Sequence, residues 1–246
     1  MRLAAIGASD VGRKRTHNED AFLVMPEAGL FCVADGLGGH ASGELASRLA
    51  VEEMARLYGA EPPTAGPDRD GARLAAAVRQ ANRRILEQAS RDPALAGMGT
   101  TLVAAWFSEE GPLVVAHAGD SRAYLFREGA LRRLTEDHSL LSSFIRAAHP
   151  SAEEIEAFPH KNVIVRALGM GDPVEVEVAA VPFEEGDLVL LCCDGLHGMI
   201  PDAAIAEILR EEGGQILRAN QSLLDAALAA GGGDNVTSVL VQVVEA

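Results

Sequence analysis

The stretch Phe31-Cys-Val-Ala-Asp-Gly-Leu-Gly-Gly-His-Ala-Ser-Gly-Glu44 contains the turn around which the rest of this chain is organised. The apolar run 30–34 predicts a buried strand, which ends at Asp35 and a glycine-rich turn before a helical pattern begins. A strand end holds a carboxylate rigidly, and glycines let backbone atoms approach a ligand without a Cβ in the way. Asp35 is therefore the first candidate ligand residue. The alternative interpretation of Asp35-Gly36 taken alone is a tight turn without any ligand.

Length and composition indicate one ordinary globular domain. The chain has 246 residues, and a hydrophobic content of 48% with a mean hydropathy of +0.10 is typical of a globular protein. No apolar run approaches the roughly 18 residues of a membrane-spanning helix. The apolar start is too short for the core of a signal peptide, since Gly7 interrupts it. We therefore expect a single domain over residues 1–246, a monomer in the cytoplasm without a membrane partner.

The net charge indicates which classes of partner the chain can bind, and the cysteine content indicates whether it contains disulfides. The net charge of −15, from 36 acidic and 21 basic residues, argues against nucleic acid and is compatible with cations. A solvated acidic surface is the alternative explanation for most of these carboxylates. The three cysteines lie in apolar runs, and the adjacent Cys192 and Cys193 would point to opposite faces of a strand. They are interpreted as core residues and not as a disulfide framework.

Hydrophobic periodicity predicts the secondary structure. Strand-like runs bounded by turn residues are 3–9, 21–25, 30–34, 100–107, 113–118, 123–127, 131–134, 163–167, 174–181, 187–193 and 236–244. Helical spacing predicts helices over 41–58, 74–89, 139–158, 203–210 and 215–229, with a loop over 59–70 and a capping box at Ser151 and Glu154. The strands fall into two blocks, each joined to a helix pair, which indicates two packed sheets with helices outside.

Acidic residues recur at predicted strand ends, most of them beside glycine: Asp20, Asp35, Asp120, Asp194 and Asp234. Each is a weak signal alone, because Gly-Asp also occurs at 171–172 and 186–187, where plain turns are predicted. Together they predict a cluster of carboxylates that would repel one another unless a cation lay between them. Oxygen ligands suit Mg²⁺ or Mn²⁺ better than zinc or copper, and no H-E-x-x-H or C-x-x-C motif occurs.

A short basic run, Arg13-Lys-Arg15, precedes the first of these acids. A guanidinium can hold a phosphoryl group through two parallel hydrogen bonds, and Arg15 is the best candidate for that role. The alternative is that these residues are ordinary surface charges.

Seven short motifs follow one another along the chain: Arg15-Thr-His-Asn-Glu-Asp20, Asp35-Gly-Leu-Gly-Gly-His40, Gly99-Thr-Thr101, Gly119-Asp-Ser-Arg-Ala-Tyr124, Leu134-Thr-Glu-Asp-His-Ser139, Cys193-Asp-Gly-Leu196 and Gly233-Asp-Asn-Val-Thr237. Each motif alone has low specificity, whereas the ordered set has high specificity. In this order they resemble the motifs of the metal-dependent serine/threonine protein phosphatases of type 2C (PPM family), and most of all the compact bacterial members.

The resemblance implies an α+β fold, a central sandwich of two antiparallel β-sheets flanked by pairs of antiparallel helices in four layers, αββα. It also implies two Mn²⁺ or Mg²⁺ ions, with a third, more weakly bound ion in bacterial members. In the family, the match of Asp35 bridges two ions and the carbonyl of the Gly36 match also binds. The matches of Asp194 and Asp234 complete the coordination shell of one ion, and the match of Asp20 serves the other. The match of Asp120 binds the third ion, and the match of Arg15 binds phosphate.

The implied reaction is hydrolysis of phosphoserine and phosphothreonine in proteins, reversing a bacterial serine/threonine kinase. The expected partners are that kinase and its targets, and an anti-sigma-type regulator is an alternative. Two ions about 3.5–4 Å apart lower the pKa of a bridging water, whose hydroxide then attacks without a protein nucleophile. Accordingly, no Cys-x5-Arg arrangement follows any cysteine. His40 is a candidate acid for the leaving alkoxide, or a cap of the following helix.

Two departures from the family pattern and two rival interpretations complete the prediction. Segment 140–162 matches the flap of bacterial members but carries Phe144-Ile-Arg-Ala-Ala-His149 where they have a glycine, so the substrate is undefined. His197 lies three residues after Asp194, and both a surface position and a contact with a ligand residue stay open.

The run 7–12 is similar to a P-loop but lacks its Gly-Lys-Ser/Thr ending. A non-catalytic binding module would need gaps in the carboxylate set, and none is found.

Overall fold

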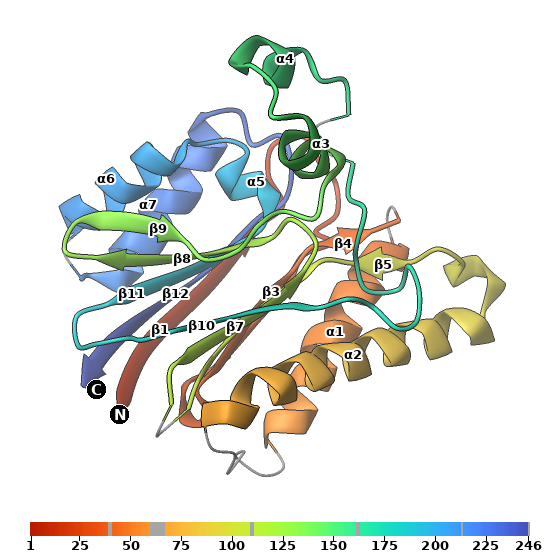
Figure 1. Ribbon diagram of the computed structural model, residues 1–246, viewed down its shortest axis with the longest axis horizontal. Coiled ribbons are helices and arrows are strands. Elements are labelled where there is room, and N and C mark those ends of the chain that lie inside the picture. The colour runs from red at the N-terminus through yellow and green to blue at the C-terminus, as the bar shows by residue number, and fades with distance from the viewer. Residues whose placement is uncertain (39–40, 60–66, 109–110, 161–162, 213, 246) are drawn as a thin grey trace.

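Two antiparallel sheets form the centre of the computed structural model, which describes residues 1–38, 41–59, 67–108, 111–160, 163–212 and 214–245. Helices cover the outer face of each sheet, so the predicted α+β sandwich is confirmed (Figure 1). No helix among the described residues is both long and apolar enough to cross a membrane.

The first sheet has the order β1-β12-β11-β8-β9. Its strands are β1 (Arg2–Asp10), β12 (Val236–Glu245), β11 (Leu188–Cys192), β8 (Arg122–Arg127) and β9 (Ala130–Arg133). Side chains along β11 and just beyond it alternate between two cores. Cys192 therefore packs under the helices and Cys193 packs between the sheets, as predicted.

The second sheet has the order β10-β7-β6-β3-β2. Its strands are β10 (Glu177–Val181), β7 (Leu113–Ala118), β6 (Leu102–Phe107), β3 (Leu30–Ala34) and β2 (Ala21–Met25). All five residues of β3 are buried because the helices cover one face of the sheet and the other sheet covers the opposite face. A continuous apolar run is the sequence pattern of such a doubly covered strand.

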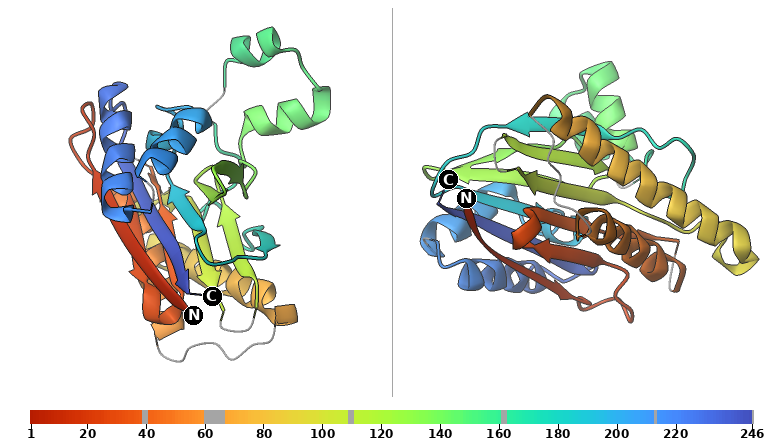
Figure 2. Two further views of the ribbon diagram at one scale, coloured as in Figure 1. Left: turned by 90° about the vertical axis from the view of Figure 1, so that its left-hand side faces the viewer. Right: turned by 90° about the horizontal axis from the view of Figure 1, so that it is seen from below.

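The helices form the outer layers (Figure 2). The pair α1 (Ala41–Gly59) and α2 (Pro67–Arg91) packs on the second sheet around Met54, Leu74 and Trp106. The first sheet is covered by α5 (Asp194–His197), α6 (Asp202–Glu212) and α7 (Ile216–Ala229). Each helix buries an apolar stripe, and this burial supplies most of its stability.

The helix predicted over 139–158 is wrong as one element. Two helices replace it, α3 (Leu140–Ala148) and α4 (Ala152–Ala157), and both project from the body of the molecule (Figures 1 and 2). Pro150 disfavours helical backbone at the residue before it, and His149 has a left-handed φ of 47°. The predicted capping box is present, with Ser151 and Glu154 bonding each other's backbone N–H groups.

The strand predicted over 163–167 is also wrong. This segment has only the isolated bridge Ser139↔Ile164, followed by Thr100↔Leu168, because it spans the end of the sheet instead of joining it. The next strand starts at Glu177 instead of 174, and α2 starts at Pro67, inside the predicted loop 59–70. Five short elements were not predicted: η1 (Pro26–Ala28), η2 (Pro93–Leu95), α5 and the pair β4 (Gly36–Leu37) with β5 (Gly99–Thr100).

Candidate metal centre

Strand ends bring the five predicted aspartates to one place. Asp20 precedes β2, Asp35 follows β3, Asp120 lies between β7 and β8, Asp194 follows β11 and Asp234 precedes β12. In an antiparallel sheet the end of one strand lies beside the start of the next, so these positions share one edge of the sandwich. Burial, and then the charges of the other four aspartates, raise the pKa of Asp35, as expected for a carboxylate that lies among them.

The backbone around Asp35 is fixed by two threonines. Thr101 Oγ1 accepts a hydrogen bond from the Asp35 N–H at 3.0 Å, and Thr100 Oγ1 donates one to the Asp35 carbonyl at 2.8 Å. At Gly36, a Cβ would overlap the carbonyl oxygen of Gly43 and lie 2.5 Å from that of Glu19. Only glycine therefore fits at position 36, where the backbone lies close to the backbone of Glu19 and Gly43.

The pKa values of four of these aspartates are raised, so their ionised forms are disfavoured. Burial raises the pKa of Asp20 to about 7, although a 2.6 Å hydrogen bond donated by Thr237 Oγ1 lowers it in part. Burial and then the charge of Asp194 raise the pKa of Asp120 to about 7. Burial raises the pKa of Asp35 well above its usual value, and burial together with the charge of Asp234 raises that of Asp194. Burial is the main physical cause, and the proximity of like charges adds to it.

The donor set fits a hard divalent cation. Asp120 lines the cleft, and its Oδ1 is buried without a hydrogen-bond partner in the described part of the chain, which leaves this oxygen available to a cation. Cys193 lies within 4.8 Å of Asp20 and Asp35, but burial raises the pKa of its thiol well above the usual value. That thiol accepts the Thr237 N–H at 3.1 Å and so is already engaged. Oxygen atoms are therefore the available ligands, as Mg²⁺ and Mn²⁺ prefer.

Arg15 lies at the rim of this cluster. Its Nη2 is 2.7 Å from Asp234 Oδ2, and its side chain is 51% exposed. The cleft beside it has a volume of about 430 Å³, and residues lining it include Asp120, Arg122, Asp194, His197, Met199 and Asp234. The predicted catalytic residue His40 lies outside the described residues, so neither its acid role nor its capping role is tested.

Three polar residues that support the cluster were not predicted as site residues. Asn235 accepts the Glu19 N–H at 2.8 Å and donates to the carbonyls of Val11 and His17, both at 2.9 Å, which fixes the loop that carries Arg15. Thr101 and Thr237 hold Asp35 and Asp20. All three lie inside the quoted motifs, so a signal existed, but their partners are distant in sequence.

His197, whose role the sequence left open, contacts Asp120, one of the five aspartates. Its Nε2 is 3.0 Å from the carbonyl oxygen of Asp120, and its ring lines the same cleft. Burial, and then the positive charge of Arg122, lowers the pKa of His197 to about 4. The ring is therefore neutral at pH 7.

A second group of titratable side chains, His117, His138 and Glu177, does not have the geometry of a metal site. The two imidazole rings stack with centroids 4.5 Å apart and planes 9° apart. An imidazole binds a metal in the plane of its ring, so two stacked rings do not direct their nitrogens at one ion. Arg166 Nη1, a cation, also lies 2.9 Å from His138 Nε2.

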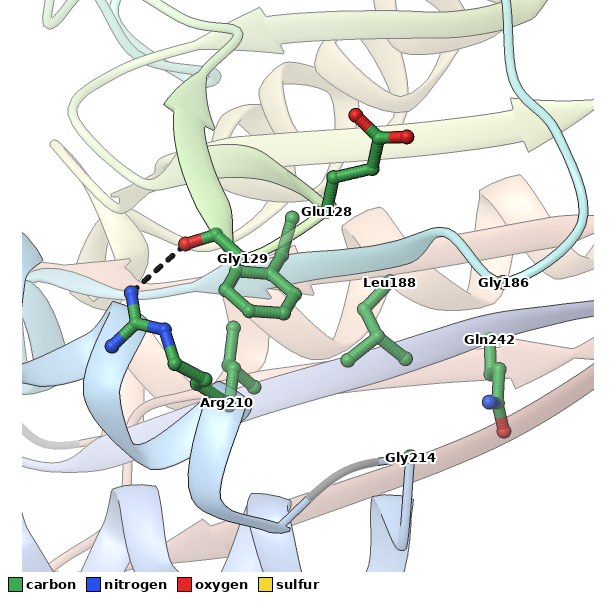
Figure 3. A pocket seen from close by; sticks show the side chains of 9 residues that line it. Glu128, Gly129, Gly186, Leu188, Arg210, Gly214 and Gln242 are labelled. Carbon is green, nitrogen blue, oxygen red and sulfur yellow. Dashed lines mark hydrogen bonds between the residues drawn. The ribbon is translucent and has the colours of Figure 1, made fainter.

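A smaller hollow lies at the other ends of β8 and β11 (Figure 3). Its volume is about 240 Å³, and Phe126, Leu188 and Leu209 form its apolar wall. Arg210 closes one side by donating to the carbonyl of Gly129 at 2.9 Å. None of the five aspartates lines this hollow, so the chemistry is assigned to the larger cleft.

An αββα sandwich with a buried carboxylate cluster at one edge, and an arginine at its rim, defines a metal-dependent phosphatase. Residues 7–230 match the family model described as protein phosphatase 2C, and the chain belongs to that family. The resemblance seen in the motifs is thereby confirmed.

Relatives with curated names agree with the family. Serine/threonine phosphatase stp of Listeria innocua is 38% identical over 237 residues, covering 95% of this chain and 93% of that protein. Serine/threonine protein phosphatase PstP of Mycobacterium tuberculosis is 40% identical over 245 residues, covering 100% of this chain and 45% of that protein.

Solved structures agree as well. The crystal structure of the Mycobacterium tuberculosis serine/threonine phosphatase PstP/Ppp superposes with a TM-score of 0.88 at 35% identity, covering 100% of both chains. The PstP catalytic domain in complex with two manganese ions gives a TM-score of 0.84 at 36% identity, covering 99% of both.

Proposed function

We propose that this chain is a metal-dependent phosphatase that hydrolyses phosphoserine and phosphothreonine in proteins and opposes a bacterial serine/threonine kinase. Residues 1–246 would act as one catalytic domain, as a monomer in the cytoplasm. The observation that carries the proposal is the convergence of five aspartates at one edge of the sandwich, with Asp120 buried and the other four half-buried, beside an arginine that pairs with Asp234. The names of the aligned relatives support the same activity.

The proposed metal ligands are those that the sequence predicted. Asp35 would serve both ions, the carbonyl of Gly36 would also bind, and Asp20 would serve one of the two ions. Asp194 and Asp234 would complete the shell of the other, and Asp120 would bind a third. When bound, Mn²⁺ or Mg²⁺ supplies an acidified water and neutralises charge on the phosphoryl oxygens. The raised pKa values of the carboxyls, caused by burial and then by mutual repulsion, support this assignment, because a bound cation stabilises the ionised form against both.

The protein's own groups perform the remaining tasks. Arg15 would bind the phosphoryl oxygens, because its pairing with Asp234 holds the guanidinium at the rim and leaves further N–H donors free of that contact. Thr100 and Thr101 hold the Asp35 backbone, so that the carboxylate does not have to reorganise. A cysteine nucleophile is not needed, and the buried, protonated thiol of Cys193 is unsuited to that role.

Phosphate release tests the proposal. We expect hydrolysis of a phosphothreonine peptide and of para-nitrophenyl phosphate that requires Mn²⁺, stops with a chelator and is abolished in Asp35→Asn. A matched control is Asp225→Asn, which removes an exposed aspartate on α7 and should keep wild-type turnover. Normal turnover by a verified Asp35→Asn protein would exclude the metal centre. Inactivity of folded wild type with Mn²⁺ would favour a binding module.

A further inference from the structure

One short helix touches two of the proposed ligand residues. Asp194 is the first residue of α5, and His197 is its last. The Nε2 of His197 is 3.0 Å from the carbonyl oxygen of Asp120, 77 residues away in sequence. A carbonyl oxygen only accepts, so Nε2 carries the proton and Nδ1 is the acceptor nitrogen of the neutral ring.

The turn around Asp120 is held from several sides. The Gly119 N–H donates to His138 Nδ1 at 3.1 Å, and Ser121 Oγ pairs with Thr101 Oγ1 at 2.7 Å. Between these anchors, the contact from His197 fixes the carbonyl of Asp120 and with it the backbone angle ψ. The backbone conformation of Asp120 sets the direction of its Cα–Cβ bond. No hydrogen bond from the described ranges orients the buried Oδ1 of its carboxylate directly.

We propose that His197 is a positioning residue: by holding the Asp120 carbonyl, it directs the Asp120 carboxylate and sets the affinity of the cation that Asp120 binds. The inference rests on the proposed function, which gives Asp120 to the third, weakest ion. It assigns His197 no contact with substrate and no proton transfer.

The helix itself does not depend on the imidazole. The Cys193 N–H bonds the Thr237 carbonyl at 3.1 Å, the Gly198 N–H bonds the Asp194 carbonyl at 2.7 Å, and Leu196 is buried in the core. Removal of the ring should therefore leave Asp194 in place and act through Asp120. This separates a positioning role from a general role in folding.

Three substitutions at one position test the contact. His197→Ala removes the donor, His197→Asn carries an amide too short to reach, and His197→Gln places its amide nitrogen close to the position of Nε2. Mn²⁺ binding is measured by titration calorimetry and by the electron paramagnetic resonance signal of free Mn²⁺. We expect the weakest class of sites to lose about 10–100-fold in affinity in Ala and Asn, as for other residues that orient ligands. Gln should restore it, and the tighter sites should keep their dissociation constants in all three.

A second variant shows whether His197 acts through Asp120. Asp120→Asn should weaken the same class of sites, and adding His197→Ala to it should cause no further loss. If Asp120→Asn weakens Mn²⁺ binding but folded His197→Ala does not, the positioning role is wrong and the metal centre stands. Equal loss at the tight sites, or Gln behaving as Ala does, would also overturn it. If wild type binds no Mn²⁺ at all, the proposed function itself fails.

Discussion

Arg15 and Asp234 form an ion pair of 2.7 Å across 219 positions of sequence. It joins the proposed phosphate-binding group to a proposed metal ligand. The Asp234 side chain is 33% exposed, so the pair lies at the boundary between the buried cluster and solvent. An exposed pair of this kind adds little to stability, and its importance is the orientation that it gives the guanidinium.

Replacing Arg15 should weaken substrate binding. Hydrogen bonds to charged groups contribute about 1.5–3 kcal/mol, so we expect Arg15→Ala to lower kcat/KM about 10–150-fold, mainly through KM. Steady-state kinetics with a phosphothreonine peptide measures this. Lys14→Ala, which removes a neighbouring exposed charge, is the control and should change kcat/KM little. An unchanged kcat/KM in Arg15→Ala would remove Arg15 from the site.

Neutralising the centre of the cluster should stabilise the metal-free protein. Asp35→Asn keeps the backbone contacts to Thr100 and Thr101 but removes the charge that the other four aspartates oppose. We expect a higher Tm for the metal-free variant at about pH 8, with about 2–4 °C for each kcal/mol of relieved repulsion. Differential scanning calorimetry in the presence of chelator measures it. A lower Tm would show that this carboxylate stabilises the fold.

The pH dependence of stability should differ between the metal-free and metal-bound protein. Asp20 and Asp120 have pKa values raised from 3.8 to about 7, mainly by burial. Between these two pH values the folded metal-free protein therefore binds more protons than the unfolded chain does. This proton binding contributes stability that is fully present below the unfolded pKa of 3.8 and is lost as pH rises through about 7.

Bound cations displace these protons, so we expect Mn²⁺ to raise Tm more at about pH 8 than at about pH 6. Calorimetric titration at about pH 6.5, in two buffers of different ionisation enthalpy, should show proton release. Equal Tm gains at both pH values would contradict the assignment.

Asn235 should matter for both stability and turnover. Asn235→Ala removes three hydrogen bonds to the backbone, each contributing about 0.5–1.5 kcal/mol to stability. We expect a lower Tm in thermal melts and a lower kcat/KM, because the loop that carries Arg15 is released. Asn220→Ala is the matched control, since it removes a buried partner of Ser238 on the helix side of β12. It should lower Tm but keep kcat/KM per folded molecule, and equal loss of kcat/KM in both would argue against a local effect.

Periodicity and local composition were sufficient for the sandwich and the aspartates, because a buried strand and the acid at its end are adjacent in sequence. Asp35 after the run 30–34 is the simplest case. The contact of His197 with Asp120 has no such local signal, since it depends on how α5 lies against a turn from another strand. Pro150 was a visible signal for the break between α3 and α4, and apolar spacing on both sides of it obscured that signal.

The projecting segment 140–160 leaves and rejoins the body at one point, where the Leu140 N–H bonds the Val163 carbonyl at 2.9 Å. Within it, the rings of Phe144 and Phe158 stack with centroids 4.8 Å apart. On the side of the body, Leu141 of α3 lines the cleft and Arg146 pairs with Glu136 at 2.6 Å, so the base of this segment borders the site. We therefore expect substitutions on α4, which lies farther out, to leave the aspartate cluster unchanged, so that this helix can diverge in sequence without loss of the metal centre.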